Sequence, residues 1–319
     1  MVSESNFRLV ESPVPSPGDG QVLLKIRYLS VDPYMRGRMT DRPSYVPPVA
    51  LGEVMCGGTV AEVVESKNPR FQPGDIVESY SGWQEYALDD GKQLRKLDPS
   101  LAPVTTALGI LGMPGLTAYF GLTEIGRPKS GETVVVSGAA GAVGSAAGQI
   151  ARILGCHAVG IAGSDEKVRA LTGRYGFDSA LNYKSTADYS AAIRDLCPRG
   201  VDVYFDNVGG AITDGVMANI NPRARIAVCG QISLYNADKP DVGPRWFPQL
   251  IIKMARAEGF LVFQFFDRYM EGVNRMAQWL NEGRLKYDEN ITEGLENAPR
   301  AFIGLFHGEN TGKQLVKLR

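Results

Sequence analysis

The chain has 319 residues, of which 44% are hydrophobic and 22% are charged, and its 34 basic residues nearly balance its 35 acidic residues. This length predicts two domains, and the even charge argues against nucleic acid as a partner, so we expect a small-molecule ligand. The polar, proline-rich start MVSESNFRLVESPVPSPGDG lacks the basic and apolar stretches of a signal peptide, and no apolar run reaches membrane-spanning length. We therefore expect a cytoplasmic protein without membrane contacts.

The first third of the chain predicts β structure. QVLLKIRYLSV, residues 21–31, alternates apolar and polar side chains, and the segments at 57–66 and 74–88 are short runs cut by Gly-Asp and Pro-Gly turns. Several short strands separated by such turns indicate a small barrel. Residues 111–126, LGMPGLTAYFGLTEIG, then predict a helix that is interrupted at its proline and glycine.

From residue 126 onward, strand and helix patterns alternate, which predicts a doubly wound parallel sheet. The proline-rich and aromatic segment 233–249 predicts a long loop on the substrate side. The final GKQLVKLR predicts a strand with no helix after it, and we expect it to return to the first domain. The predicted strands are residues 133–137, 156–162, 179–183, 201–207, 225–229 and 259–265, and the predicted helices are residues 142–154, 165–175, 187–196 and 210–220.

The four cysteines and two histidines are scattered singly along the chain. Their spacing shows neither a disulfide framework nor a cluster of zinc ligands. We expect no metal site, and we expect the cysteines to serve as small buried residues.

The segment VVVSGAAGAVGSAAGQIARILG, residues 134–155, predicts a strand, a glycine turn and a helix of small residues. Its glycines, Gly138, Gly141 and Gly144, depart from the G-x-G-x-x-G spacing of the standard dinucleotide fingerprint. The order of strand, turn, helix and strand nevertheless favours a turn whose backbone N–H groups bind a pyrophosphate. The alternative is a turn whose glycines only permit tight packing.

The next predicted strand ends in Gly163 and Ser164 rather than in the acid that binds the ribose of NAD. This small end leaves room for the 2′-phosphate of NADP, which Lys167 can neutralise. Ser164 can also be a helix N-cap, and the two roles are compatible. Asp165, directly after it, keeps NAD open as an alternative.

Seven segments occur in order along the chain: SVDPYMRGRM, GAAGAVGSAAGQIA, GSDEK, GFDSALNYK, VDVYFDNVGG, ARIAVCGQISLYN and EGLENAPRAFIGLFHGENTGKQLVK. Together they resemble the zinc-independent branch of the medium-chain dehydrogenase/reductase superfamily, which includes prostaglandin reductases, leukotriene B4 12-hydroxydehydrogenases and 2-alkenal or curcumin reductases. The resemblance implies an α/β fold. It consists of a GroES-like β-barrel substrate domain at residues 1–116, completed by residues 290–319, and a Rossmann NADP-binding domain at residues 117–289.

Zinc-dependent relatives carry a cysteine near SVDPYMR and a histidine near ALGEVM, and this chain has neither residue there. Reduction of a carbonyl without zinc lacks its Lewis acid. Hydride transfer to an activated carbon–carbon double bond needs only hydrogen-bond donors for the enolate oxygen. The resemblance therefore implies an NADPH-dependent reductase of α,β-unsaturated aldehydes or ketones.

The resemblance also implies which residues bind the cofactor. Those expected to hold the pyrophosphate are Gly141, Ala142, Val143 and Gly144. Those expected around the 2′-phosphate are Ser164, Lys167 and Tyr183. Those expected to border the nicotinamide half or to reach the cofactor from the C-terminal tail are Asn207, Cys229, Gly230, Ile232, Ser233, Tyr235, Phe260, Leu261, Val262 and Asn310. On sequence alone, Asn207 is equally well explained as a loop-forming residue before two glycines.

Tyr235 is the candidate for chemistry, because a phenol near the nicotinamide ribose can donate a hydrogen bond to the substrate oxygen as negative charge develops. Its alternative role is that of an aromatic wall residue, since a phenol with a pKa of about 10 is a weak acid. Tyr34 and Tyr45 of the barrel domain are candidate substrate contacts, and both can equally be packing residues.

Two other functions stay open. The first is an NADPH quinone oxidoreductase with the same fold and cofactor, and the second is a non-catalytic NADPH-binding protein. We also expect a homodimer, because the apolar segment EGFLVFQFF at residues 258–266 needs cover.

Overall fold

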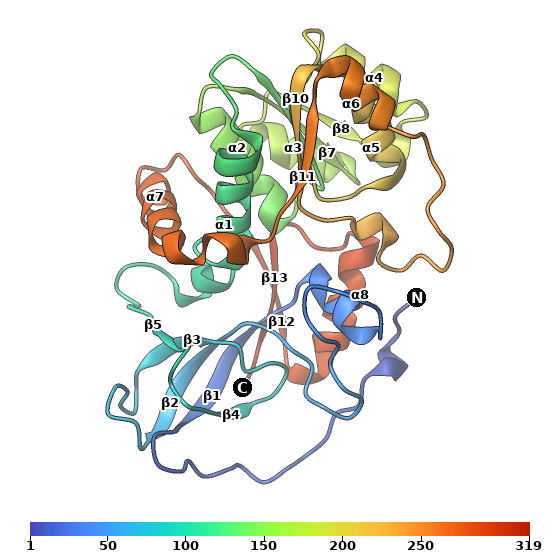
Figure 1. The fold of residues 1–319 in the computed structure, drawn as a ribbon. Coiled ribbons are helices and arrows are strands. Elements are labelled where there is room, and N and C mark those ends of the chain that lie inside the picture. Colours follow the sequence, from blue (N-terminus) through green and yellow to red (C-terminus); the bar gives the residue numbers. More distant parts are fainter. The chain divides into compact units, whose positions relative to one another are not determined.

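The computed structural model describes residues 1–319, which divide into two compact units. The first unit comprises Met1–Gly109 and Glu289–Arg319, and the second comprises Ile110–Asp288. The first unit contains the strands β1 (Val22–Ser30), β2 (Thr59–Ser66), β3 (Ile76–Ser79), β4 (Tyr86–Asp89), β5 (Arg95–Lys96), β12 (Glu289–Glu293) and β13 (Lys313–Lys317), and the helix α8 (Ala298–His307) (Figure 1).

A curved sheet forms the first unit, with the strand order β12-β13-β1-β2-β3-β5. β4 pairs with the start of β1 and β13 with its end, so one strand has two successive neighbours along the same edge. Two register shifts between β1 and β2 bend the strand, as bulges do in barrels. The apolar side chains of β1 and Phe302 of α8 are buried together in the core of this barrel-like unit.

A buried ion pair ties the C-terminal strand to the first unit. Lys313, at the start of β13, is only 4% exposed, and its Nζ donates at 2.9 Å to Asp32 Oδ1 and at 2.9 Å to the Val31 carbonyl. Ser30 donates to the other oxygen of Asp32. These contacts attach the SVDPYMR segment, which continues as a 3-10 helix at Pro33–Met39, to β13.

The second unit is a six-stranded parallel sheet with the order β11-β10-β9-β6-β7-β8. The strands are β6 (Thr133–Ser137), β7 (His157–Ala162), β8 (Ser179–Asn182), β9 (Val201–Asp206), β10 (Ile220–Val228) and β11 (Arg256–Gly259). The helices are α1 (Met113–Phe120), α2 (Ala142–Ile153), α3 (Asp165–Gly173), α4 (Tyr189–Leu196), α5 (Gly210–Met217), α6 (Phe247–Lys253) and α7 (Tyr269–Asn281).

The strand order reverses between β6 and β9. The chain moves outward from β6 through β7 to β8 and then returns to the other side of β6, so the two directions separate at this point. Right-handed crossovers put α2 and α3 on one face of the sheet and α4, α5 and α6 on the other (Figure 1). In such folds the ligand lies at the carboxyl ends of the strands at the reversal, which here are the ends of β6 and β9. The doubly wound sheet predicted from the sequence is confirmed.

Two predictions for local structure were wrong. Pro114 does not interrupt a helix: it lies in the first turn of α1, where its missing N–H costs nothing. The strand predicted at 259–265 lies three residues earlier, as β11 at Arg256–Gly259, and a 3-10 helix at Val262–Arg268 occupies most of the predicted range. That helix directs Phe265 onto Phe120, where the two rings stack with their centroids 4.8 Å apart.

The predicted loop at 233–249 starts within a short 3-10 helix, Ile232–Leu234, and α6 begins inside it at Phe247. A proline in the first turn, which the sequence analysis assigned to a loop, starts this helix instead. Helices α7 and α8 were not predicted from the sequence.

Candidate functional site

The backbone of the turn between β6 and α2 accounts for the irregular spacing of its glycines. Gly138 has a φ of +59°, which favours glycine. A Cβ at Gly144 would lie 2.3 Å from the Gly138 carbonyl oxygen, so only glycine lets the helix begin this close to the turn. At Gly141, a Cβ would meet only that same oxygen, at 3.3 Å. Gly138 and Gly144 are therefore needed to fold the turn, whereas a Cβ at Gly141 would make only this one tight contact.

Helix α2 begins without a side-chain cap, because its N-cap residue is Gly141. The N–H groups of the first turn, at Ala142, Val143 and Gly144, have no partner within a helix by its geometry. Together with the positive end of the helix dipole, they form a binding site suited to an anion such as a pyrophosphate. These N–H donors fit the cofactor that the sequence predicts.

The residues predicted around the 2′-phosphate meet at the end of β7. Ser164 is the N-cap of α3, and its Oγ accepts a hydrogen bond from the Lys167 N–H at 3.2 Å. The phenol of Tyr183 lies over Gly163, because a Cβ at that glycine would be 3.0 Å from Tyr183 Oη. The structure thus brings Ser164, Lys167 and Tyr183 together, and it gives Ser164 the capping role that the sequence left open.

Two neighbouring residues were missed by the sequence analysis. Asn182 Nδ2 donates to Asp165 Oδ1 at 2.7 Å. The carboxylate that left NAD as an alternative cofactor is therefore already hydrogen-bonded to an amide. Lys184 is close enough to affect Lys167: burial, and then the charge of Lys184, lower the pKa of the Lys167 ammonium. Two cations, beside a carboxylate that is already hydrogen-bonded to an amide, form a region that favours a phosphate. For Lys184, the signal in the sequence was its position directly after Tyr183.

Asn207 joins the two strands at the reversal of the sheet. Its backbone N–H donates to Ser137 Oγ at 2.9 Å, and its Nδ2 donates to the Ser137 carbonyl at 2.7 Å. The residue therefore ties the end of β9 to the end of β6. This contact gives Asn207 a structural role and also holds it where a ligand of such a fold lies.

The segment at residues 229–235 folds back onto the end of β9. The N–H groups of Cys229 and Gly230 donate to the Asp206 carbonyl at 2.8 and 3.0 Å. The Ile232 N–H donates to the Asn207 carbonyl at 3.3 Å. The Ser233 hydroxyl and N–H both donate to the carbonyl of Val208, at 2.6 and 3.1 Å. This ladder fixes the backbone of the segment predicted to border the nicotinamide.

Tyr235, the candidate for chemistry, turns back toward the start of this segment. Its Oη accepts a long hydrogen bond, 3.4 Å, from the Gln231 N–H. The same oxygen would lie 3.1 Å from a Cβ at Gly230, so a glycine there leaves room for the phenol. Tyr235 is half-buried, and it lies at the end of the sheet where Asn207 and residues 229–233 converge.

Phe260 is a core residue of the second unit. It is 6% exposed, its ring meets Phe205 edge to face with centroids 6.1 Å apart, and its N–H donates to the Val228 carbonyl at 3.4 Å. Leu261 and Val262 follow it at the start of the 3-10 helix. Since the Phe260 side chain is occupied by packing, this segment can offer a ligand its backbone.

In the first unit, the hydroxyls of Tyr34 and Tyr80 are 2.6 Å apart. Loss of solvent around the hydroxyls raises the pKa of Tyr34, and it raises that of Tyr80 to about 12 although the Tyr80 residue as a whole is 54% exposed. Both phenols therefore stay protonated at neutral pH. Tyr45 is 53% exposed, and Asn310 Nδ2 donates locally to the Gly312 carbonyl at 2.9 Å. Tyr80 was not among the sequence predictions.

No group of three or more His, Cys, Asp or Glu side chains is arranged to hold a metal ion. No helix has both the length and the apolar character needed to cross a membrane.

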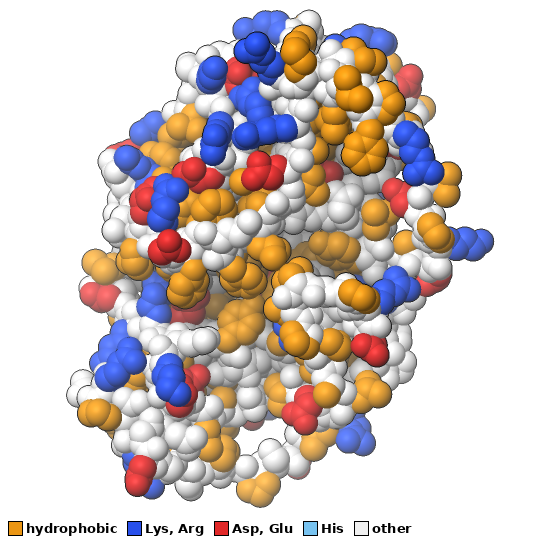
Figure 2. Space-filling model, in the orientation of Figure 1, with side chains coloured by type: hydrophobic (Ala, Val, Ile, Leu, Met, Phe, Trp, Pro, Cys, Tyr) orange, Lys and Arg blue, Asp and Glu red, His pale blue; other side chains and the backbone are white.

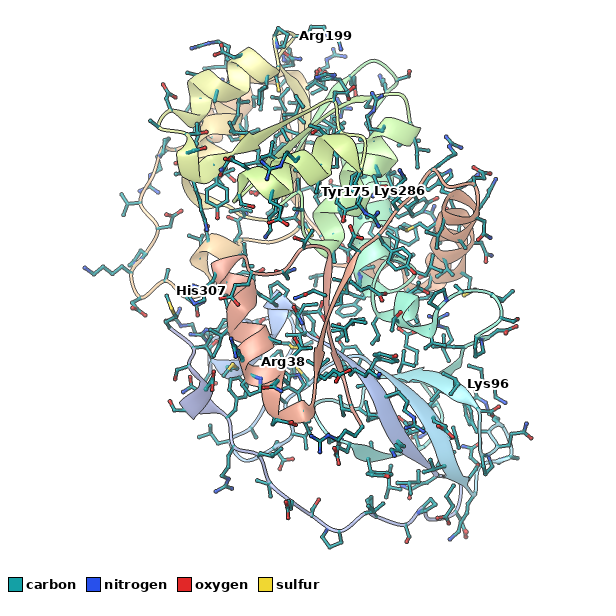
Figure 3. The ribbon with its side chains drawn as sticks, turned by 180° about the vertical axis from the view of Figure 1, so that it is seen from behind. Arg38, Lys96, Tyr175, Arg199, Lys286 and His307 are labelled. Carbon is teal, nitrogen blue, oxygen red and sulfur yellow. The ribbon has the colours of Figure 1, made fainter.

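A pocket of about 360 Å³ opens on the second unit between the ends of α2 and α3, where Tyr175 and Lys286 lie (Figure 3). None of the predicted site residues lines it.

Comparison with known proteins gives two family matches. Residues 1–97 match the model described as the N-terminal domain of oxidoreductase. Residues 142–278 match the model described as zinc-binding dehydrogenase.

Individual relatives are similar along nearly their whole length. The chain is 49% identical to an NADPH-dependent curcumin reductase of Escherichia coli, with 98% of this chain and 92% of the relative covered. It is 47% identical to an NADP-dependent 2-alkenal reductase of Nicotiana tabacum, with 94% and 88% covered. Among solved structures, CurA of Vibrio vulnificus in complex with NADPH is 45% identical, covers 100% of this chain and 96% of its own, and superimposes with a TM-score of 0.95.

Proposed function

Because this chain belongs to the medium-chain dehydrogenase/reductase family of NADP-dependent oxidoreductases, we propose that it reduces the carbon–carbon double bond of α,β-unsaturated aldehydes and ketones with NADPH. The curcumin reductase and the 2-alkenal reductase, each nearly half identical to it, support this reaction class. The structurally similar CurA binds NADPH, which supports the same cofactor.

The end of β7 carries the argument for NADPH over NADH. Lys167 and Lys184 supply positive charge there, and Asn182 occupies the Asp165 carboxylate that would otherwise compete with a phosphate. We assign Ser164, Lys167 and Tyr183 to the 2′-phosphate. Gly141 and the N–H groups of residues 142–144, at the uncapped start of α2, hold the pyrophosphate in this proposal.

The segments after β9, β10 and β11 border the nicotinamide half in this proposal. They contribute Asn207, the backbone of residues 229–235 and the backbone of residues 260–262, and Asn310 contributes from the tail of the first unit. Bound NADPH supplies the hydride, which goes to the β-carbon of the substrate. The chain's own residues then have to stabilise the negative charge that forms on the carbonyl oxygen.

Tyr235 meets that requirement, because its hydroxyl donates a hydrogen bond to the substrate oxygen. Its oxygen already accepts the Gln231 N–H, and a hydroxyl that accepts one hydrogen bond becomes a stronger donor in the next. A proton from water then reaches the α-carbon and completes the saturated product. Tyr34 and Tyr45 are the proposed substrate contacts of the first unit, where Tyr34 presents a protonated phenol.

The test follows NADPH consumption by the purified protein in the near ultraviolet with a simple enone such as 3-buten-2-one, and identifies the product by mass spectrometry. We expect the saturated ketone. Consumption with quinones but not with enones would replace the proposal by a quinone oxidoreductase. A thermal shift with NADPH and no turnover of either substrate class would indicate a non-catalytic NADPH-binding protein.

We further propose that the protein is a homodimer assembled through β11 and α6. β11 is the edge of the parallel sheet, and its residues, Arg256–Gly259, are all exposed. Beside it, α6 exposes Phe247 and Ile251, each 78%, and Ile252, 70%, and apolar side chains gather over this helix (Figure 2). An exposed edge strand next to an apolar patch is suited to pairing with a second copy.

Light scattering after size exclusion tests the homodimer. We expect the mass of two chains for the wild type and of one chain for Ile251→Glu. Ile291→Glu, on β12 of the first unit and 44% exposed, is the matched control and should remain dimeric. A wild-type protein with the mass of one chain at all concentrations would contradict the assembly.

A further inference from the structure

Asp206 is a buried carboxylate to which the proposed reaction assigns no role. It is the last residue of β9 and only 1% exposed. One of its oxygens, Oδ1, accepts hydrogen bonds from Ser137 Oγ at 3.0 Å and from Tyr204 Oη at 2.8 Å. The backbone N–H groups of Val208 and Gly209 donate to the same oxygen, each at 3.0 Å.

The other oxygen, Oδ2, accepts two side-chain hydrogen bonds of equal length. Thr213 Oγ1, on α5, and Gln231 Nε2 each donate to it at 2.8 Å. No basic side chain forms an ion pair with Asp206, so hydrogen bonds alone compensate its burial. A buried carboxylate satisfied in this way holds its donors firmly, because each lost donor leaves part of the charge unsolvated.

Among these six donors, Gln231 alone lies in the segment proposed to border the nicotinamide. Its Nε2 also donates to the Gly230 carbonyl at 3.1 Å, and its N–H donates to Tyr235 Oη. The fold makes room for its amide at Gly209, whose φ is +75° and where a Cβ would lie 2.1 Å from Gln231 Oε1. The amide therefore sits in a space that a glycine has left open for it.

We propose that Gln231 is a positioning residue whose amide, held by Asp206, sets the backbone of residues 230–235 and the phenol of Tyr235 for NADPH binding and hydride transfer. This inference rests on the proposed function. The negative charge of Asp206 also acts on the neighbouring thiol, since burial and then that charge raise the pKa of Cys229 to about 12. Cys229 thus remains a neutral thiol at the start of the segment.

Thr213→Val is a matched control for Gln231→Leu, because each substitution removes two hydrogen bonds. Thr213→Val removes the bond to Asp206 Oδ2 and a 3.0 Å contact with the Tyr204 hydroxyl. Gln231→Leu removes the bond to the same oxygen and the bond to Gly230. Both variants weaken the support of Asp206, but only the second releases the segment that carries Tyr235.

The experiment measures melting temperature, the Kd of NADPH by fluorescence titration, and kcat with an enone. We expect a similar drop in melting temperature for both variants. Gln231→Leu should raise the Kd or lower kcat by about 10- to 150-fold, the usual effect of one hydrogen bond to a charged group, whereas Thr213→Val should leave both close to wild type. Equal Kd and kcat in the two variants would overturn the proposal.

A third variant, Gln231→Glu, gives a readout that a packing role does not predict. At neutral pH its carboxylate faces Asp206 without a donor, so Kd and kcat should be impaired. As the pH falls, the introduced acid gains a proton and can donate its O–H to Asp206, so its activity relative to wild type should rise. A pH profile parallel to that of the wild type would argue against the proposal.

Failure of the wild type to reduce any enone would refute the proposed function and leave the positioning role to be judged by the Kd of NADPH. If Gln231→Leu does not fold, Gln231→Asn takes its place, because it keeps an amide that is one methylene too short to reach Asp206. Its Kd and kcat should then be impaired as for leucine, and wild-type values would overturn the inference.

Discussion

Replacing Lys167 with alanine should remove most of the preference for NADPH over NADH. Lys167 lies in the first turn of α3, where Ser164 caps the helix and Tyr183 covers Gly163. Its backbone is therefore held at the end of β7, so its side chain starts beside the place assigned to the 2′-phosphate. NADH lacks that phosphate, so the substitution should weaken NADPH binding and leave NADH binding nearly unchanged.

The size of the effect follows from the surroundings of Lys167. A hydrogen bond between charged groups contributes about 1.5–3 kcal/mol, and partial exposure of this lysine favours a value of about 2 kcal/mol. Since every 1.4 kcal/mol is a factor of ten, the preference should fall about 30-fold. Lys184 is exposed, so Lys184→Ala should lower the preference by only about threefold.

Steady-state kinetics with both cofactors and one enone measures kcat/KM for each, and titration measures the two Kd values. The pH dependence gives a second check: burial and Lys184 lower the pKa of Lys167, and only its protonated form attracts phosphate. The preference should therefore decline as the pH rises, at a lower pH than for an ordinary lysine. An unchanged ratio in Lys167→Ala would refute the assignment and leave this segment only its helix-capping role.

Four further substitutions are expected to act separately. Asn182→Leu frees the Asp165 carboxylate to approach a ribose and should raise kcat/KM with NADH several-fold, whereas an unchanged value would mean that the carboxylate does not reach the cofactor. Gly144→Ala should destabilise the fold by about 1–3 kcal/mol in denaturant titrations, because its Cβ would overlap the Gly138 carbonyl. Gly141→Ala should leave stability near wild type and weaken NADPH binding, and equal stabilities of the two alanine variants would contradict this division of roles. Tyr235→Phe should lower kcat about 10–100-fold with little change in the Kd of NADPH, and an unchanged kcat would return Tyr235 to a packing role.

The alternation of strands and helices could be predicted from the sequence wherever residue types, turns and apolar patterns favour the same structure. The strand predicted at 133–137 and the helix predicted from Ala142 coincide with β6 and the start of α2, because a β-branched run, a glycine turn and small helical residues all favour the same structure. The apolar run at 259–265 was ambiguous, since its length suits either a strand or a buried helical turn. Phe265 packs on Phe120, which is far away in the chain, and this contact favours the helical turn over the strand.

Candidate site residues were accessible where they follow a strand or open a helix, as Ser164 and Asn207 do. Gln231 was not accessible, because its role depends on Asp206, 25 residues earlier, and on space left by Gly209. Asn182 was missed for the same reason, since its partner Asp165 lies on another element. A single sequence carries no signal for a hydrogen bond between distant side chains.

The attachment of β13 to β1 has a consequence for the order in which the protein folds during synthesis. The first sheet contains the earliest strands, but it also needs residues 289–317, and Asp32 acquires its buried ammonium partner only when Lys313 has been made. The second unit, at residues 110–288, has all its strands before that moment. We therefore infer that on the ribosome the second unit can complete its sheet while the first still exposes the edge of β1, an interval in which the nascent chain is open to strand pairing with other chains.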